Sequence, residues 1–503
     1  MAFDGEHGVP NPVPASGDRS ARLIPRTRRS ERCTWRVSKS LFSASLVLPL
    51  ALAGCGSVQS VRTLVAGPPS PYLSGFIGYV VADEPVAALA GRDVLARGGN
   101  AADAAAAVGM ALSVTLPSRA SLGGGGACLA YRPGARSVPE AFLFTPVAGT
   151  DTSGTGGRPA AVPMTARGLF LMQARYGSVS FDEVVKPAAR LARSGITVSR
   201  ALSDDLAVVS RPLLGDPGAA AIFAPGGVPL VAGDQLVQPD LAASLDRVAL
   251  AGTGDLYTGL LSQDYADGAR AAGAGLSRDD LRNAVPAQSA PLLVDAGADR
   301  IAFLPPPADG GLGAAAAFRA PGGDGTEVAN GTVASWRSSH PGAGNGGSYA
   351  AEAQGLIGGG SSGGRLGRLP ASTAFTVLDR HGGAVACALT MDNLFGTGRV
   401  AGRTGIVLGA SPARVPSPLL AASIAWNPTA GSFRAAVAGS GQNDAAAAVA
   451  EGTARALRGQ PASPVTETGR VNAISCTRGL PGDQAGCAAS TDPRGSGLAT
   501  RSD

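Results

Sequence analysis

The sequence predicts a fold in which layers of sheet and helix are stacked on one another. An apolar strand at 80–82 is followed at once by a helical pattern over 83–98. A second, alanine-rich helix is predicted from Asn100 to Leu112, and residues 373–391 have the alternation of a β-hairpin. Because strands and helices that follow one another must bury their apolar faces mutually, a layered arrangement follows.

Local signals define these elements. Asp83-Glu84-Pro85 opens the first helix and Gly98-Gly99 ends it, while Asn100 caps the second helix and Pro117 breaks it. Residues 373–379 and 384–391 form the two strands of the hairpin around a turn at Arg380 to Gly383.

The remaining stretches differ in composition. Gly123 to Gly126 precede a further strand, and helical patterning dominates 164–270. Residues 309–370 are rich in glycine, serine and alanine with weak periodicity, which predicts a loose, poorly ordered connector.

The N-terminus carries an export signal. Arginines are dense over 19–37, and an apolar run from Leu41 to Ala53 follows, ending in Leu52-Ala53-Gly54-Cys55. The run is about 13 residues long, too short for a bilayer span of roughly 20. Leu-Ala-Gly-Cys resembles the bacterial lipobox, so we expect residues 1–54 to be a signal peptide and Cys55 to be lipidated. An ordinary signal peptide with a chance cysteine is the alternative.

This signal predicts a location and a tether. Residues 55–76 are rich in proline, serine and glycine and are expected to link the lipid to the folded region. Gly56 is not the acidic residue expected to retain a lipoprotein at the inner membrane. We therefore expect the protein on the periplasmic side of the cell envelope, anchored by its lipid to the outer membrane.

Charge and cysteines narrow the function classes. The net charge of +5 is small, and much of it lies in the leader, which argues against nucleic-acid binding. Cys128 and Cys387 lie in apolar runs and are predicted to be buried free thiols, whereas Cys476 and Cys487 flank a turn and could form a disulfide.

Histidine-dependent chemistry is poorly supported. The chain has three histidines, of which His7 lies in the leader, His340 in the connector and His381 at the hairpin tip. Neither a Ser-His-Asp triad nor a zinc site is indicated, and no cofactor or metal is expected. A serine, threonine or cysteine at a newly made N-terminus offers another route, because its own α-amino group can act as the base.

Several blocks, in order, resemble the γ-glutamyltransferase family. They are Gly98 to Ala105, Leu122 to Gly126, Val162-Pro163, Tyr176-Gly177, Val185 to Ala188, Leu191 to Gly195, Gln238 to Leu241, Pro305 to Pro307 with Gly310-Gly311, Phe395 to Gly398, Val400 to Gly402 with Gly405-Ile406, and Asp492 to Arg494. The resemblance covers most of 77–497.

The resemblance implies an α+β fold, the four-layer αββα sandwich of N-terminal-nucleophile hydrolases. It also implies a large-subunit-like region (77–371) and a small-subunit-like region (372–503), separated by self-cleavage into fragments Cys55–Ala371 and Ser372–Asp503. The cleaved protein is then expected to attack small γ-glutamyl amides such as glutathione. The family's cleavage block aligns with residues 372–379, so Ser372 is the expected nucleophile. A strand-entry serine in an inactive site is the alternative.

The same alignment assigns the other site residues. Thr390 occupies the place of a threonine that hydrogen-bonds the nucleophile, and Asp392 with Asn393 that of a substrate-contacting asparagine. Local roles in the strand and turn are the alternatives for these three. Gln442 and Asn443 stand where the family has a glycine pair that stabilises the oxyanion, and backbone N–H groups there could still serve.

The chain departs from the family where the substrate's charged groups are held. Leu143 stands nearest the expected arginine, Arg414 falls about where an acid belongs, and Leu420-Ala421 replaces a serine pair. Two further readings therefore stay open: an inactive, lipid-anchored binding or scaffold protein, and an acylase of the same superfamily that acts on a non-glutamyl amide.

Overall fold

The computed structural model describes residues 72–150, 157–320, 322–341, 349–358, 364–464 and 466–502. The predicted signal peptide, Cys55 and the tether as far as residue 71 lie outside these described residues. In the described ranges no helix has the length and apolar character needed to cross a bilayer.

A first large sheet carries the predicted hairpin at its centre. All neighbouring strands in it pair antiparallel. Its strands, in spatial order, are β17 (Leu498–Ser502), β1 (Gly78–Ala82), β11 (Thr373–Asp379), β12 (Ala384–Thr390), β2 (Gly125–Tyr131), β3 (Glu140–Phe144) and β8 (Ala287–Ser289). The predicted strand at 80–82 and the hairpin are thereby confirmed.

A second large sheet faces the first. In spatial order it contains β16 (Cys487–Thr491), β15 (Arg470–Leu480), β14 (Ser432–Ser440), β13 (Ala421–Asn427), β10 (Asp299–Phe303) and β9 (Leu292–Ala296). Two short ladders join β4 (Val147–Ala148) to β5 (Ala161–Val162) and β6 (Ile196–Thr197) to β7 (Gln235–Leu236).

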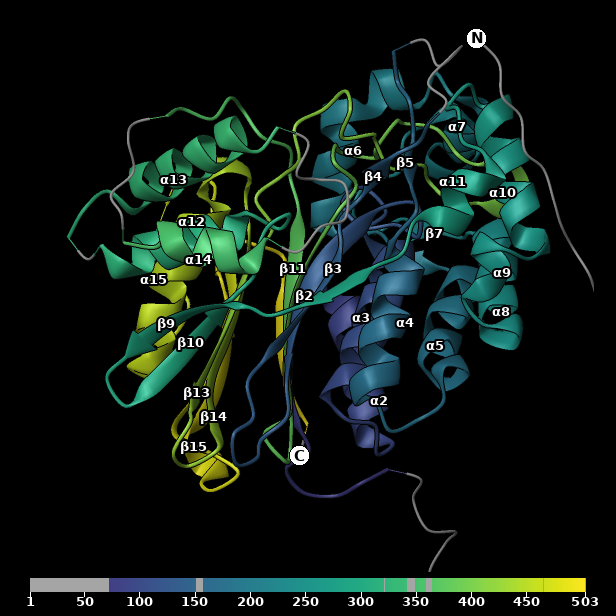
Figure 1. Cartoon of the computed structure of the whole chain (residues 1–503). Helices are drawn as coiled ribbons and strands as arrows, with labels where there is room; N and C mark the ends of the chain where they lie inside the picture. The colour runs from purple at the N-terminus through teal and green to yellow at the C-terminus, as the bar shows by residue number, and fades with distance from the viewer. Residues whose placement is uncertain are drawn as a thin grey trace, which may run out of the picture. The chain divides into compact units, whose positions relative to one another are not determined.

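Helices cover the outer faces of both sheets. Figure 1 shows α2 to α5 on one side of the paired sheets and α12 to α15 on the other, so four layers are stacked as helix, sheet, sheet and helix. The helices are α2 (Pro85–Ala96), α3 (Ala101–Thr115), α4 (Thr165–Tyr176), α5 (Phe181–Ser194), α6 (Arg200–Leu213), α7 (Pro217–Phe223), α8 (Pro239–Ala251), α9 (Gly254–Tyr257), α10 (Leu260–Ala271), α11 (Arg278–Asn283), α12 (Gly310–Arg319), α13 (Gly325–Ser339), α14 (Ala350–Leu356) and α15 (Ala445–Leu457).

Alternation along the hairpin assigns its side chains to the two faces of the first sheet. Phe375 and Leu389 belong to the core beneath the helices, whereas Ala374 and Ala388 belong to the core between the sheets. Small side chains at the inter-sheet positions let the two sheets pack closely, since successive residues of a strand point to opposite faces.

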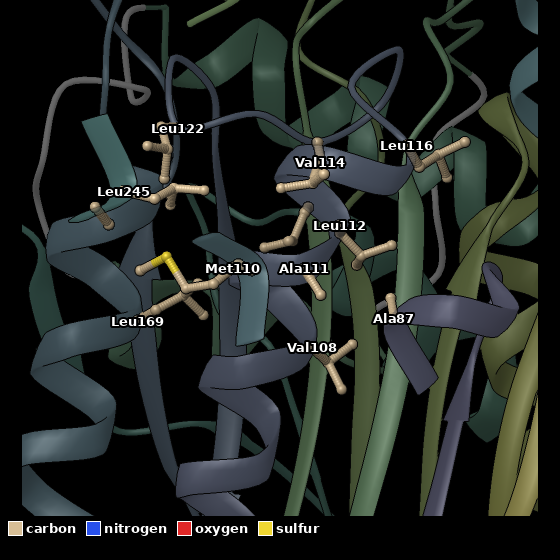
Figure 2. Packing of buried hydrophobic residues seen from close by; sticks show 14 of the residues in the cluster. Ala87, Val108, Met110, Ala111, Leu112, Val114, Leu116, Leu122, Leu169 and Leu245 are labelled. Carbon is tan, nitrogen blue, oxygen red and sulfur yellow. The ribbon is translucent and has the colours of Figure 1, made fainter. Parts of the chain in front are cut away.

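Helix α3 is the central support of the first sheet. Its N-terminus has the predicted cap at Asn100, strengthened by a reciprocal hydrogen bond with Asp103, and all of its residues are buried. It extends to Thr115, three residues beyond the predicted end at Leu112. Figure 2 shows its apolar side chains packed among Ala87, Leu169 and Leu245 from three other helices.

The predicted loose connector is wrong for much of 309–370. Helices α12 and α13 fill 310–319 and 325–339, and α14 spans 350–356. Asp324 caps α13 through hydrogen bonds from the backbone N–H groups of Thr326 and Glu327. A glycine- and alanine-rich helix has little contrast between its faces, so its pattern is weak although it packs tightly against the sheet.

Both cysteine pairs are disulfides. The prediction that Cys128 and Cys387 are free thiols is wrong: they face each other on β2 and β12 and are bonded. Cys476 and Cys487, which face each other on β15 and β16, are also bonded. Neighbouring positions on antiparallel strands bring Cβ atoms within bonding reach, which an analysis of each strand by itself misses.

Candidate active site

Ser372 lies at the entry of β11, opposite Thr390. The ladder pairs Thr373 with Leu389, so the next residues outward, Ser372 and Thr390, face each other across it. Both have the parity of Ala374 and Ala388, which places their side chains on the inter-sheet face. Ser372 is 1% exposed, and its Oγ has no hydrogen-bond partner in the described part of the chain. The expected nucleophile is therefore buried and uncommitted.

The hydroxyl of Thr390 forms a local hydrogen bond. Its Oγ1 accepts a hydrogen bond from the backbone N–H of Asp392 at 2.8 Å. This bond fixes the turn that leaves β12, as the alternative reading of Thr390 had it. Ser372 lies one residue before the Thr373–Leu389 pair that ends the ladder, and Thr390 lies one residue after it.

Asp392 has an unusual environment. Its backbone is in the left-handed region at φ 56°, which aspartate tolerates better than most residues. Its side chain is fully buried, and neither carboxyl oxygen has a hydrogen-bond partner among the described residues. Burial raises the pKa of the Asp392 carboxyl well above its usual range, and the charge of Arg337 offsets only part of this effect.

Arg337 is a site residue that the sequence did not predict. It projects from α13 and donates two hydrogen bonds to Asp309, from Nε at 2.6 Å and from Nη2 at 2.8 Å. Asp309 is 5% exposed and immediately precedes α12. The paired guanidinium and carboxylate thus join the two helices of the supposed connector, and the charge of Arg337 acts on Asp392.

Gln442 and Asn443 follow β14 in a tight turn. Gly441 and Gln442 both have positive φ, 113° and 55°. Within the described residues the backbone N–H groups of Gln442 and Asn443 donate to no protein acceptor. Two unused donors at a strand end have the chemistry of an oxyanion site.

The side chain of Asn443 is already engaged. Its Oδ1 accepts from the backbone N–H of Leu369 at 3.0 Å, and its Nδ2 donates to the carbonyl of Gly367 at 3.0 Å. Asn443 therefore holds the segment that leads into Ser372, a role that the sequence did not indicate.

Asp83 joins three strand ends beside the site. Its Oδ2 accepts hydrogen bonds from the Thr373 hydroxyl, the Ala374 backbone N–H and the Ser440 hydroxyl, and its Oδ1 accepts from Asn472. The sequence suggested only that Asp83 opens a helix, yet Glu84 is the residue that caps α2. Asp83 instead fixes the start of β11, next to Ser372.

Leu143 and Arg414 stand where the family resemblance implies an arginine and an acid, and the two residues have different surroundings. Leu143 is 4% exposed and lies in the inter-sheet core, facing Ala127 on β2. Arg414 is exposed and lines a pocket together with Asn393. Leu143 is thus an apolar wall, and Arg414 has the opposite charge to the acid expected there.

The two histidines in the described residues, His340 and His381, make local contacts. His340 stacks on Trp336 and contacts Glu352 through Nε2 at 2.8 Å, and His381 accepts a hydrogen bond from Arg380 at the hairpin tip. In the described ranges no group of three histidine, cysteine or acidic side chains could hold a metal ion.

Comparison with known proteins matches this chain to one family. The model of the family described as Gamma-glutamyltranspeptidase matches residues 87–340. The chain is 32% identical over 280 residues to the glutathione hydrolase proenzyme of Escherichia coli (strain K12), covering 50% of this chain and 48% of that protein. It is 36% identical over 230 residues to the Acylase ACY 1 proenzyme of Pseudomonas sp. (strain SE83), covering 42% and 41%.

The matches to the curated relatives cover only part of each protein, whereas a solved structure resembles most of this chain. The chain spans about half the length, or less, of the curated relatives it matches, and Ser372 lies beyond the residues that match the family model. A cephalosporin acylase from Bacillus halodurans has a similar structure, with a TM-score of 0.67 and 18% identity over 86% of this chain and 98% of that one. This likeness confirms the expected α+β sandwich.

Proposed function

Since this chain belongs to the γ-glutamyltranspeptidase family, we propose that it is an amide hydrolase or acyl transferase that cleaves itself between Ala371 and Ser372. The observation that carries the proposal is the buried, unpartnered Oγ of Ser372 opposite Thr390. A hydroxyl held at a strand entry without a partner is available to attack the carbonyl immediately before it.

Self-cleavage uses the Ser372 hydroxyl, the peptide bond that precedes it and one water molecule. Ser372 Oγ attacks the Ala371 carbonyl carbon, and its proton passes to the Ser372 nitrogen as the C–N bond breaks. The acyl group thereby moves from nitrogen to oxygen as an ester. Water then hydrolyses the ester, leaving Ala371 with a carboxylate and Ser372 with an α-amino group. The unused N–H groups of Gln442 and Asn443 are suited to stabilise the oxyanion, and Asn443 steadies the segment before the scissile bond.

Turnover of a substrate amide repeats this chemistry. The new α-amino group takes the proton from Ser372 Oγ, which attacks the amide carbonyl and forms an acyl-enzyme. The amine leaves with a proton, and water or a second amine releases the acyl group. Asp392, whose burial favours the neutral carboxyl, can then both donate and accept a hydrogen bond, as the side-chain amide of an asparagine does.

Two substrate classes are in question. γ-Glutamyl amides such as glutathione are one class, in keeping with the family. Non-glutamyl amides are the second, and the surroundings of Leu143 and Arg414 favour them, because neither residue complements the charged groups of a free amino acid. The similarity to an acylase proenzyme is in keeping with that second class.

The N-terminal segment bears on where the protein is located. We propose that the mature chain begins at Cys55, carries lipid there and remains at the outer membrane on its periplasmic side. Stable anchoring takes more than one acyl chain, and these depend on the thiol. A Cys55→Ala protein should appear in the soluble fraction; equal membrane retention would contradict the anchor.

A denaturing gel with intact mass measurement tests self-cleavage. The wild-type protein, with its disulfides reduced, should give fragments ending at Ala371 and beginning at Ser372, while Ser372→Ala stays whole. Cleavage before Thr373 would move the nucleophile by one residue, to the opposite face of the strand. A wild-type chain that stays whole after long incubation would instead favour an inactive binding or scaffold protein.

A further inference from the structure

A pocket of about 180 Å³ is lined in part by the loop that leaves β12. Its walls include Asn393 to Gly398, the residues that follow Asp392, together with Arg158, Ser411 and Arg414. The volume is below the roughly 300–1,000 Å³ of pockets for drug-sized ligands, so a small molecule or the end of a larger one would fit.

The pocket is lined by both cationic and apolar side chains. Arg158 and Arg414 supply two guanidinium groups, and among the described residues that line the pocket none is acidic. Leu213 and Phe395 supply apolar surface. Neither arginine forms an ion pair with a described residue, although Arg158 donates a long hydrogen bond of 3.4 Å to the carbonyl of Thr397.

A third guanidinium lies close to Arg158. Arg399 donates to the carbonyl of Gly273 at 2.6 Å and to the carbonyl of Arg158 at 3.5 Å. Burial, and then the nearby charge of Arg158, lower the pKa of Arg399. Arg399 does not itself line the pocket, and the charge of Asp216 acts on its pKa in the opposite direction. The positive charge inside the pocket is therefore that of Arg158 and Arg414, which attract an anion.

We propose that this pocket binds a small organic carboxylate, with the carboxylate between Arg158 and Arg414 and the apolar part against Leu213 and Phe395. Paired guanidinium groups suit a carboxylate through charge-assisted hydrogen bonds, and the apolar wall favours an organic acid over an inorganic anion.

Two sources of such a carboxylate fit the same chemistry. One is the acyl part of the substrate, which would make the substrates half-amides of dicarboxylic acids; this version rests on the proposed function. The other is a free organic acid that binds independently of turnover. Asn393, which lines the pocket, is the next residue after Asp392 in the loop that leaves β12.

Binding can be measured without turnover. Full-length Ser372→Ala protein would be titrated with hexanoate and with the neutral hexanamide in a calorimeter. Hexanoate should bind at least about tenfold more tightly, the factor expected for one charge-assisted hydrogen bond. Arg414→Gln or Arg158→Gln should lower hexanoate affinity about tenfold, while the exposed Arg403→Gln, outside the pocket, should not.

Kinetics of the wild-type enzyme separate the two sources. If the pocket holds the acyl part, succinyl p-nitroanilide should exceed butyryl p-nitroanilide in kcat/KM, and hexanoate should compete with it. If hexanoate binds but does not inhibit turnover, and the succinyl and butyryl p-nitroanilides have equal kcat/KM, the ligand is a separate organic acid. Equal binding of hexanoate and hexanamide, or unchanged binding in both pocket variants, would overturn the proposal whether or not the chain cleaves itself.

Discussion

Cys128 and Cys387 are joined by a disulfide whose two ends lie on opposite sides of the proposed cleavage point. Cys128 belongs to the large-fragment region and Cys387 to the small-fragment region, and both are fully buried on adjacent strands of the first sheet. Cleavage at Ala371–Ser372 would therefore leave the two fragments covalently linked.

This link has a simple signature on a denaturing gel. Processed wild-type protein should migrate as one species without reductant and as two fragments with it, because breaking one peptide bond does not release a disulfide-bonded chain. A Cys128→Ser, Cys387→Ser double variant should give two fragments in both lanes. Two wild-type fragments without reductant would show that these cysteines are not bonded.

The contacts of Asn443 predict a defect in self-cleavage. Asn443→Ala removes both hydrogen bonds to the segment before Ser372, each with a net value of about 1 kcal/mol. If they position the scissile bond, cleavage should slow about tenfold or more, measured as the appearance of fragments with time. Gln442→Gly is the matched control, because it keeps the backbone N–H group and relieves a positive φ. Equal rates for Asn443→Ala and wild type would exclude the positioning role.

Asp83 offers a second test of positioning. Asp83→Asn can keep only part of the four hydrogen bonds that tie β11 to its neighbours, so both cleavage rate and thermal stability should fall. We expect a loss of about 1–3 kcal/mol in the free energy of unfolding. The exposed Asp267→Asn should change neither quantity. Unaltered cleavage in Asp83→Asn would mean that the start of β11 is held by other contacts.

Because the carboxyl of Asp392 is buried, we expect the free energy of unfolding to depend on pH. Burial raises its pKa in the folded protein, so the folded state binds more protons than the unfolded state between the two pKa values. Its effect is therefore to lower stability as the pH rises above about 4, by about 1.4 kcal/mol for each pH unit up to the pKa of the folded state. Asp392→Asn removes this dependence. The melting temperature of the Ser372→Ala, Asp392→Asn double variant should exceed that of Ser372→Ala by more at pH 8 than at pH 5. Parallel curves would show that Asp392 ionises without penalty.

The sequence predicted the scaffold better than the site. Alternation and turn residues define the hairpin at 373–391, and a cap and a proline define α3, because these signals act between near neighbours. Ser372 and Thr390 are predicted as site residues from the family resemblance, which aligns them with the nucleophile and its neighbouring threonine. The local commitment of Thr390 to Asp392 was one of two readings, and only the structure decides between them.

The rest of the site depends on contacts between distant parts of the chain. Asp309 and Arg337 lie in a stretch whose glycine and alanine content hid two helices, and their ion pair forms only when α12 and α13 pack together. Asp83 meets Ser440 and Asn472 through the stacking of two sheets. No local periodicity contains that information.

The departures from the family at Leu143 and Arg414 bear most directly on substrate choice. A free α-amino and α-carboxyl group must be held by complementary charges, and a buried Leu143 with a cationic Arg414 provides an apolar wall and a repulsive charge. We expect kcat/KM for γ-glutamyl p-nitroanilide to lie within about tenfold of that for a simple acyl p-nitroanilide. Arg414→Asp should raise the γ-glutamyl value selectively, because it restores an acid near the substrate's ammonium group, whereas Arg403→Asp should not. A preference of wild type for the γ-glutamyl substrate by about 10⁴ would show that other residues recognise the amino acid, since discrimination of that size requires paired polar groups in the site.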